Sequence, residues 1–172
     1  MTKGYTCSTC GEIHSGLPFS YGSPAPALWL DVPETEREKR ILLSSDQCVI
    51  DGKYYFVLGR LEIPVIDTEE DLFSWNAWVS LSEASFDRMT ELWEANGREL
   101  EQPYFGWLST ALPCYSEPTL NLKVHVHTRP VGERPFVELE PTDHPLAVEQ
   151  RRGISLDRVQ EIAELVLHGG GR

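Results

Sequence analysis

Residues 120–140 have the sequence LNLKVHVHTRPVGERPFVELE, which decides the fold class more clearly than any other part of the chain. The first half of this stretch alternates apolar and polar residues, as a β-strand with one buried face does. A second strand follows a turn that contains proline and glycine. The register that pairs Val126 with Val137 on the apolar face also pairs His125 with Glu138 on the polar face. Because both faces agree, the stretch predicts an antiparallel hairpin.

Two other parts of the chain predict β-strands. Residues 48–50 and 54–58 are apolar and are separated by Asp51-Gly52, a dipeptide typical of hairpin turns. Residues 73–81 alternate, with the larger apolar side chains on one face. The chain therefore contains at least two predicted hairpins and one further strand.

Helices are predicted between and after the strands. Pro33, acidic residues and then basic residues predict a short helix over residues 31–43. Ser82 is the expected cap of a second helix, and Ser155 caps a third that ends at Gly169. The order of elements predicts an α+β fold with a mostly antiparallel sheet, about three helices and an N-terminal loop like a zinc knuckle.

Length and charge limit the possible functions. A chain of 172 residues fits a single domain over residues 1–172, in which residues 1–18 form the metal-knuckle segment and residues 169–172 a frayed tail. The net charge of −12 argues against nucleic acid as a partner. No apolar run is long enough for a membrane helix, and no secretory signal is evident. We expect a cytoplasmic protein.

The N-terminal segment carries the strongest chemical signal. Cys7 and Cys10 are separated by two residues and followed by Gly11, a pattern typical of half a zinc ribbon. A redox pair would need the cysteines at the start of a helix, which this proline-rich sequence does not predict. The pattern favours a structural zinc ion, with a redox pair or unrelated cysteines as the alternatives.

A closed zinc site needs four ligands, and a second pair of cysteines is absent from the sequence. His14 follows Cys10 at a distance that a turn can close. Cys48 is the other candidate, with Asp46 or water as an alternative in its place. The expected set is therefore Cys7, Cys10, His14 and Cys48, although His14 could be a surface residue and Cys48 a small buried one.

Three other groups of reactive side chains have ordinary structural interpretations. His125 and His127 share one face of a strand and could bind a metal, but a solvated sheet face fits them better. The sequence Asp143-His144-Pro145 is typical of a helix start, with Thr142 or Asp143 as the cap. Cys114 has no neighbouring base in the sequence, so we expect it to be buried.

Aromatic residues are dense in the second half of the predicted sheet, and most of them belong to the core by periodicity. Trp78 lies on the opposite face of its strand from Trp75, and Trp107 follows a glycine. We expect these two tryptophans, Trp78 and Trp107, to be exposed and to mark a surface for a ligand or partner.

Four blocks of sequence occur in an order that suggests a known family: Cys7-x-x-Cys10-Gly11-x-x-His14, Phe73-x-Trp75-x-x-Trp78-Val79-Ser80-Leu81, Tyr104-Phe105-Gly106-Trp107-Leu108 and His144-Pro145-Leu146-Ala147-Val148-Glu149-Gln150. The chain resembles the bacterial family known as domain of unknown function 2199 over nearly its whole length. The resemblance implies a single bacterial cytoplasmic domain and adds weight to the knuckle. It implies no catalytic residue, substrate or partner, because such proteins are uncharacterised.

Two functions remain open. The first is a zinc-stapled binding protein without catalytic activity, which recognises an unidentified protein or small ligand. The second is a zinc-dependent hydrolase, in which three protein ligands leave a position for water. The sequence contains no phosphate loop, nucleophile elbow or paired-histidine helix motif, so we favour the first.

Overall fold

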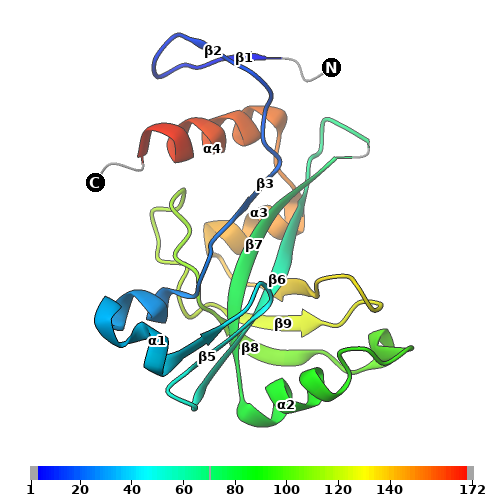
Figure 1. Cartoon of the computed structure of the whole chain (residues 1–172). Helices are drawn as coiled ribbons and strands as arrows, with labels where there is room; N and C mark the ends of the chain where they lie inside the picture. Colours follow the sequence, from blue (N-terminus) through cyan, green and yellow to red (C-terminus); the bar gives the residue numbers. More distant parts are fainter. Residues whose placement is uncertain (1–3, 70, 170–172) are drawn as a thin grey trace.

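The computed structural model describes residues 4–69 and 71–169 (Figure 1). The strands are β1 (Tyr5–Thr6), β2 (Ile13–His14), β3 (Ser20–Gly22), β4 (Ile41–Leu43), β5 (Gln47–Ile50), β6 (Tyr54–Pro64), β7 (Leu72–Leu81), β8 (Tyr104–Leu108), β9 (Lys123–His127) and β10 (Phe136–Leu139). The α-helices are α1 (Arg37–Arg40), α2 (Glu83–Glu91), α3 (Pro145–Arg152) and α4 (Leu156–Gly169). Short 3₁₀ helices occur at Ala27–Asp31, Glu34–Glu36 and Arg98–Leu100.

Strands β6 to β10 form a closed barrel of five strands. Each strand pairs with the next one antiparallel, and β10 returns to pair with β6. In such a meander the first and fifth strands run in the same direction, so the closing pair, Phe136 with Arg60, is parallel. A second parallel pair joins β3 to β7. The α+β class and the mostly antiparallel pairing are confirmed, but the sheet closes into a barrel with extensions, which the sequence did not predict.

The long strands β6 and β7 are buried on both faces. One face contributes Leu61, Phe73 and Trp75 to the barrel core, which β9, β10, α3 and α4 complete. The opposite face forms a second cluster, in which Trp78 packs with residues of β4, β5 and the segment before them. The expected exposure of Trp78 is therefore wrong, because residues 28–32 cover it and leave only 1% of its surface accessible.

The β9–β10 hairpin has the register that the sequence predicts. Val126 is opposite Val137, and His125 is opposite Glu138. The side chains on the outer face pair along diagonals, with His127 Nε2 at 3.4 Å from Glu138 Oε1. This face is polar and partly exposed, as a solvated sheet face should be.

The β5–β6 hairpin is also confirmed, and its loop contains Asp51 and Gly52 with positive φ angles of 55° and 64°. The helix expected over residues 31–43 is shorter than predicted. Helical turns end at Arg40, since residues 41–43 are strand β4 and pair with β5.

The last two helices lie next to each other in sequence and cover the barrel. Pro145 is the first residue of α3, as expected, but the cap is His144 rather than Thr142 or Asp143. The imidazole Nδ1 of His144 accepts the Leu146 N–H at 3.1 Å, which satisfies a free amide of the first turn. Ser155 Oγ accepts the Arg158 N–H at 3.1 Å at the start of α4.

The expected frayed tail at residues 169–172 falls mostly outside the described residues, and Gly169 is the last residue of α4. No described helix has the length and hydrophobicity that spanning a membrane requires.

Candidate metal centre

The N-terminal knuckle, defined as residues 4–14, is a two-stranded ribbon closed by a tight turn. β1 pairs with β2, and the Cys7 N–H donates to the Glu12 carbonyl at 2.9 Å. Gly11 donates its N–H to the Cys7 carbonyl at 2.9 Å and has a φ angle of 75°. Only glycine adopts this angle without strain, so the turn that brings Cys10 back towards Cys7 depends on Gly11.

Four potential metal ligands converge at this turn. Their ligand atoms all lie within 4.8 Å of one another, and the set is Cys7, Cys10, His14 and His168. Cys7 Sγ lies 3.2 Å from His168 Nε2, and Cys10 Sγ lies 3.4 Å from His14 Nε2. A tetrahedral zinc ion places neighbouring sulfur and nitrogen ligands roughly 3.5 Å apart, given bond lengths of about 2.3 and 2.0 Å. The donor set and its spacing therefore fit such an ion.

The structure brings together three of the four expected ligands and replaces the fourth. Cys48 lies on β5 in the second apolar cluster, where it packs with Phe56 and Trp78 and has 0% of its surface exposed. Burial raises the pKa of its thiol to about 11, which suits a small apolar core residue. Cys48 therefore lies outside the cluster, and His168 occupies the place in it that the sequence predicted for Cys48. Asp46, the alternative, pairs instead with Arg134 at 3.0 Å.

Helix α4 supplies His168 and two further side chains to the knuckle. Gln160, Glu164 and His168 are spaced by four residues, so they form one stripe along the helix. Glu164 accepts the N–H of Ser8 at 2.7 Å and also its hydroxyl. Gln160 Nε2 donates to the Thr6 carbonyl at 3.0 Å. α4 thus holds the ribbon through polar contacts, and Figure 1 shows the two side by side at one end of the molecule.

Electrostatics at the turn favour anionic sulfur and oxygen. Burial alone would raise the pKa of Cys7. Hydrogen bonds from the amides of Cys10 and Thr9 and from His168 outweigh this effect and lower the pKa to about 6. The hydroxyl of Ser8, Gln160 and the Ser8 amide lower the pKa of Glu164 to about 2. A Cys7 thiolate near neutral pH is the form that ligates a metal.

The pKa of Cys10 moves in the opposite direction. A hydrogen bond from the Glu12 amide lowers it, but desolvation and the neighbouring Cys7 sulfur raise it more. Two sulfur atoms this close cannot both be anionic without a cation between them, because like charges repel. The pair is therefore suited to share a positive ion.

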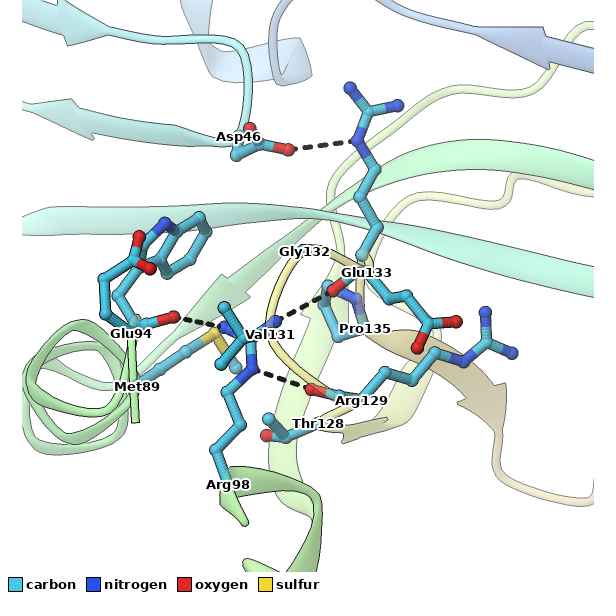
Figure 2. Close-up of a pocket in the computed structure, with 12 residues that line it drawn as sticks. Asp46, Met89, Glu94, Arg98, Thr128, Arg129, Val131, Gly132, Glu133 and Pro135 are labelled. Carbon is cyan, nitrogen blue, oxygen red and sulfur yellow. Dashed lines mark hydrogen bonds and ion pairs between the residues drawn. The ribbon is translucent and has the colours of Figure 1, made fainter. Parts of the chain in front are cut away.

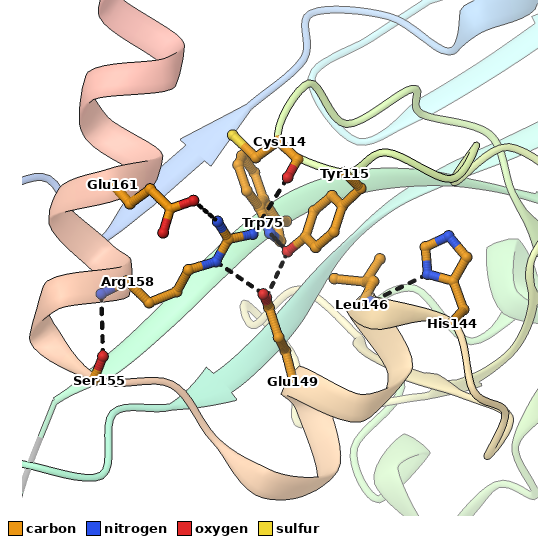
Figure 3. Close-up of polar contacts among 9 residues, drawn as sticks. All are labelled: Trp75, Cys114, Tyr115, His144, Leu146, Glu149, Ser155, Arg158 and Glu161. Carbon is orange, nitrogen blue, oxygen red and sulfur yellow. Dashed lines mark hydrogen bonds and ion pairs between the residues drawn. The ribbon is translucent and has the colours of Figure 1, made fainter. Parts of the chain in front are cut away.

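Several other residues with reactive side chains have structural roles. The Cys114 carbonyl accepts a hydrogen bond from Arg158, and burial raises the pKa of the Cys114 thiol to about 11. Figure 3 shows Arg158 also paired with Glu149, which accepts the Tyr115 hydroxyl at 2.8 Å. This network ties the loop after β8 to α3 and α4.

Arg98 is buried and has no carboxylate partner among the described residues. Its guanidinium donates to four backbone carbonyls, of Trp93, Arg129, Pro130 and Glu133, at 2.7 to 3.0 Å. Figure 2 shows the bonds to Arg129 and Glu133. A cavity of about 230 Å³ lies beside them, between α2 and the β9–β10 turn. Arg98 therefore fixes that turn to the end of α2.

The aromatic residues expected at a surface divide between two environments. Trp78 is in the second cluster, whereas Trp107 on β8 keeps 40% of its surface exposed. Phe105, two residues earlier, is 42% exposed and its ring centre lies 5.2 Å from that of Trp107. Lys123 on β9 reaches to 5.9 Å from the Trp107 ring. We call Phe105, Trp107 and Lys123 the aromatic face.

Comparison with known proteins assigns the chain to a family. The family described as "uncharacterized protein conserved in bacteria (DUF2199)" matches residues 6–154. The chain belongs to this family. The resemblance noted in the sequence is thus confirmed, and the DUF2199 match includes Cys7, Cys10 and His14 but ends before His168. A search of curated proteins gave no match, and neither did a search of solved structures.

Proposed function

We propose that this DUF2199 protein is a zinc-stapled binding protein of the bacterial cytoplasm without catalytic activity. The observation that carries the proposal is the convergence of Cys7, Cys10, His14 and His168, whose ligand atoms lie within 4.8 Å of one another. Two sulfur and two nitrogen ligands in tetrahedral range are typical of structural zinc. Zinc bound there would join the N-terminal knuckle to α4.

A closed ligand set argues against the alternative function, a zinc-dependent hydrolase. A catalytic zinc ion keeps one position for water, whereas four protein ligands fill a tetrahedral shell. A hydrolase would also need a general base at the ion, and Asp46, the expected candidate, is not in the ligand cluster. The side chains around the turn bond to one another and to backbone, as in a structural site.

The binding activity is assigned to the aromatic face. Phe105 and Trp107 stand side by side on β8 and are each about two-fifths exposed, although aromatic side chains of this size normally bury most of their surface. Exposed aromatic residues beside a cation are typical of surfaces that bind a protein or small ligand. The partner is not nucleic acid in this proposal, because the net charge of −12 opposes it.

Elemental analysis of the purified protein tests the zinc assignment. We expect about one zinc ion per chain. Cys7→Ser and Cys10→Ser should abolish binding, and His14→Ala and His168→Ala should weaken it. Cys48→Ser is the matched control, since it removes a thiol of the same chain outside the cluster, and it should keep the full metal content. A metal-free wild-type protein, purified without chelators, would disprove the assignment.

Cobalt substitution distinguishes the closed site from a hydrolytic one. The visible spectrum of bound Co²⁺ reports its coordination, and a closed site should not change on addition of azide. A spectrum that shifts with azide would favour an open position and the hydrolase. For the aromatic face, a Trp107→Ala variant that binds the partners of the wild-type protein equally well would contradict the assignment of that face.

A further inference from the structure

The two cysteines of the knuckle differ in their access to solvent although they share one turn. Cys10 is exposed, whereas Cys7 is buried against His168. Their sulfur atoms are within 4.8 Å of each other, and the Gly11-to-Cys7 hydrogen bond holds the intervening turn closed. A disulfide requires the sulfurs to approach to about 2.05 Å, which side-chain rotation can achieve when the backbone is already folded back.

We propose that the Cys7–Cys10 pair is an oxidation site for hydrogen peroxide or a small organic hydroperoxide, at which disulfide formation expels the zinc ion. The inference rests on the proposed function for its metal, but the disulfide itself needs only the two sulfurs.

The chemistry proceeds in two steps with peroxide as the oxidant. The exposed Cys10 sulfur attacks one peroxide oxygen, the O–O bond breaks, and a sulfenic acid and hydroxide form. The Cys7 sulfur then attacks the Cys10 sulfur, the S–S bond forms, and the S–O bond breaks to release a second hydroxide. Two protons convert the hydroxides to water. The two thiolates lose two electrons in total, and the peroxide gains them.

Loss of the metal follows from the loss of thiolate ligands. A disulfide sulfur carries no negative charge and binds zinc poorly, so only His14 and His168 would remain of the four ligands. The hydrogen bonds of Glu164 and Gln160 would still attach the knuckle to α4. The body of α4 would stay in place because Val159 and Ile162 are buried in the barrel core.

The other two cysteines are poorly placed for this reaction. Cys48 is fully buried, and Cys114 lies half-buried in the loop after β8. Neither belongs to the cluster in which the Cys7 and Cys10 sulfurs lie within 4.8 Å of each other. A double variant, Cys48→Ser with Cys114→Ser, is therefore the matched control.

The test is a peroxide titration of the zinc-loaded full-length protein, of metal-free wild-type protein, of the double variant and of Cys10→Ser. The wild-type protein and the double variant should each lose the mass of two hydrogen atoms, and peptide mapping should link Cys7 to Cys10. A chromogenic chelator should detect one zinc released per disulfide formed, and a dithiol reductant with added zinc should restore the starting state. Cys10→Ser should form no intramolecular disulfide.

Three results would overturn the proposal: oxidation of Cys10 to sulfinic acid without a disulfide, a disulfide between two chains, or zinc retained after the Cys7–Cys10 bond has formed. A protein purified without zinc would disprove the proposed function and, with it, the release of zinc on oxidation. In that case the mass of the peroxide-treated metal-free protein, together with peptide mapping of its disulfide, still decides whether the Cys7–Cys10 pair is an oxidation site.

Discussion

The knuckle and the barrel are stabilised in opposite ways. In residues 4–14, Cys7 alone is buried, and Ile13 keeps 77% of its surface exposed. Every barrel strand, in contrast, contributes apolar side chains to one continuous core. Burial of apolar surface is the main favourable term in folding, and the knuckle has almost none of it.

This difference indicates what a metal bound by the Cys/His cluster would contribute. A segment without a core must be ordered by ligands and polar contacts, as small zinc domains are. The contacts come from α4, so segments about 160 residues apart in the sequence meet at the knuckle. The barrel is stabilised by its apolar core and needs no metal ion. The two regions should therefore respond independently to metal and to core mutations.

Removal of the metal should have the largest effect, and it should be confined to the knuckle. Structural zinc binding contributes about 10–16 kcal/mol in small zinc domains, more than any single side chain in the barrel. After chelation we expect the amides of Cys7 and Gly11 to lose protection in hydrogen exchange, while those of β6 and β7 keep theirs. Loss of protection throughout the barrel would contradict the independence of the two regions.

Two tryptophans provide the next test, this time within the barrel sheet. Trp78→Ala should lower the free energy of unfolding by about 3–5 kcal/mol, because Trp78 is 1% exposed and its loss leaves a cavity. Trp107→Ala, on the neighbouring strand, is the matched control and should cost about 1 kcal/mol or less. Urea unfolding measures both. Equal losses would show that Trp78 is not in a closed core.

The local parts of the fold could be predicted from the sequence. The alternation in β9 and β10 defines their register because side chains point to opposite faces with a period of two. Closure of the barrel could not be predicted, since it depends on contacts between distant segments. A Cβ on Gly59 of β6 would lie 2.5 Å from Val137 of β10, so the closing pair requires a glycine that alternation does not reveal.

The Cys/His cluster was likewise predictable only where its residues are close together in the sequence. Cys7, Cys10 and His14 lie within eight residues of one ribbon, and their spacing predicts that they come together. His168 is 161 residues from Cys7, and the histidine has no distinctive sequence around it. The available signal was the spacing of Gln160, Glu164 and His168, which places three polar side chains on one stripe of α4. Cys48 was expected instead because thiols are good zinc ligands, but its strand places it in an apolar core.

A smaller effect is expected from Gly106→Ala, which tests how tightly β7 and β8 pack. An added Cβ would lie 2.5 Å from Val79 Cγ1 and 2.7 Å from the Ser80 carbonyl oxygen. The carbonyl oxygen belongs to the backbone of β7, so it can move away only if the strand itself shifts. We expect a loss of about 1–3 kcal/mol in urea unfolding, with unchanged zinc content. Gly169→Ala is the control, since nothing lies within 4 Å of its added Cβ. An unaffected Gly106→Ala variant would mean that the strands separate more easily than their contacts indicate.

The smallest effect is expected at Glu164, which links the two regions. Glu164→Gln removes the charge that accepts the two Ser8 hydrogen bonds, and we expect zinc affinity to fall about tenfold in chelator competition. Glu161→Gln, on the same helix but paired with Arg158, should leave the affinity unchanged.

The difference in zinc affinity between the wild-type protein and Glu164→Gln should depend on pH in a direction that the pKa of Glu164 determines. The pKa of Glu164 is lowered from 4.5 to about 2 when the contact forms, so the contribution is fully present above about pH 4.5 and is lost as pH falls towards 2. The affinity ratio between wild-type protein and Glu164→Gln should therefore stay constant from about pH 8 to about pH 5, although both proteins bind zinc less well as their cysteines take up protons. A ratio that shrinks within this range would show that Ser8 does not hold the carboxylate in its ionised form.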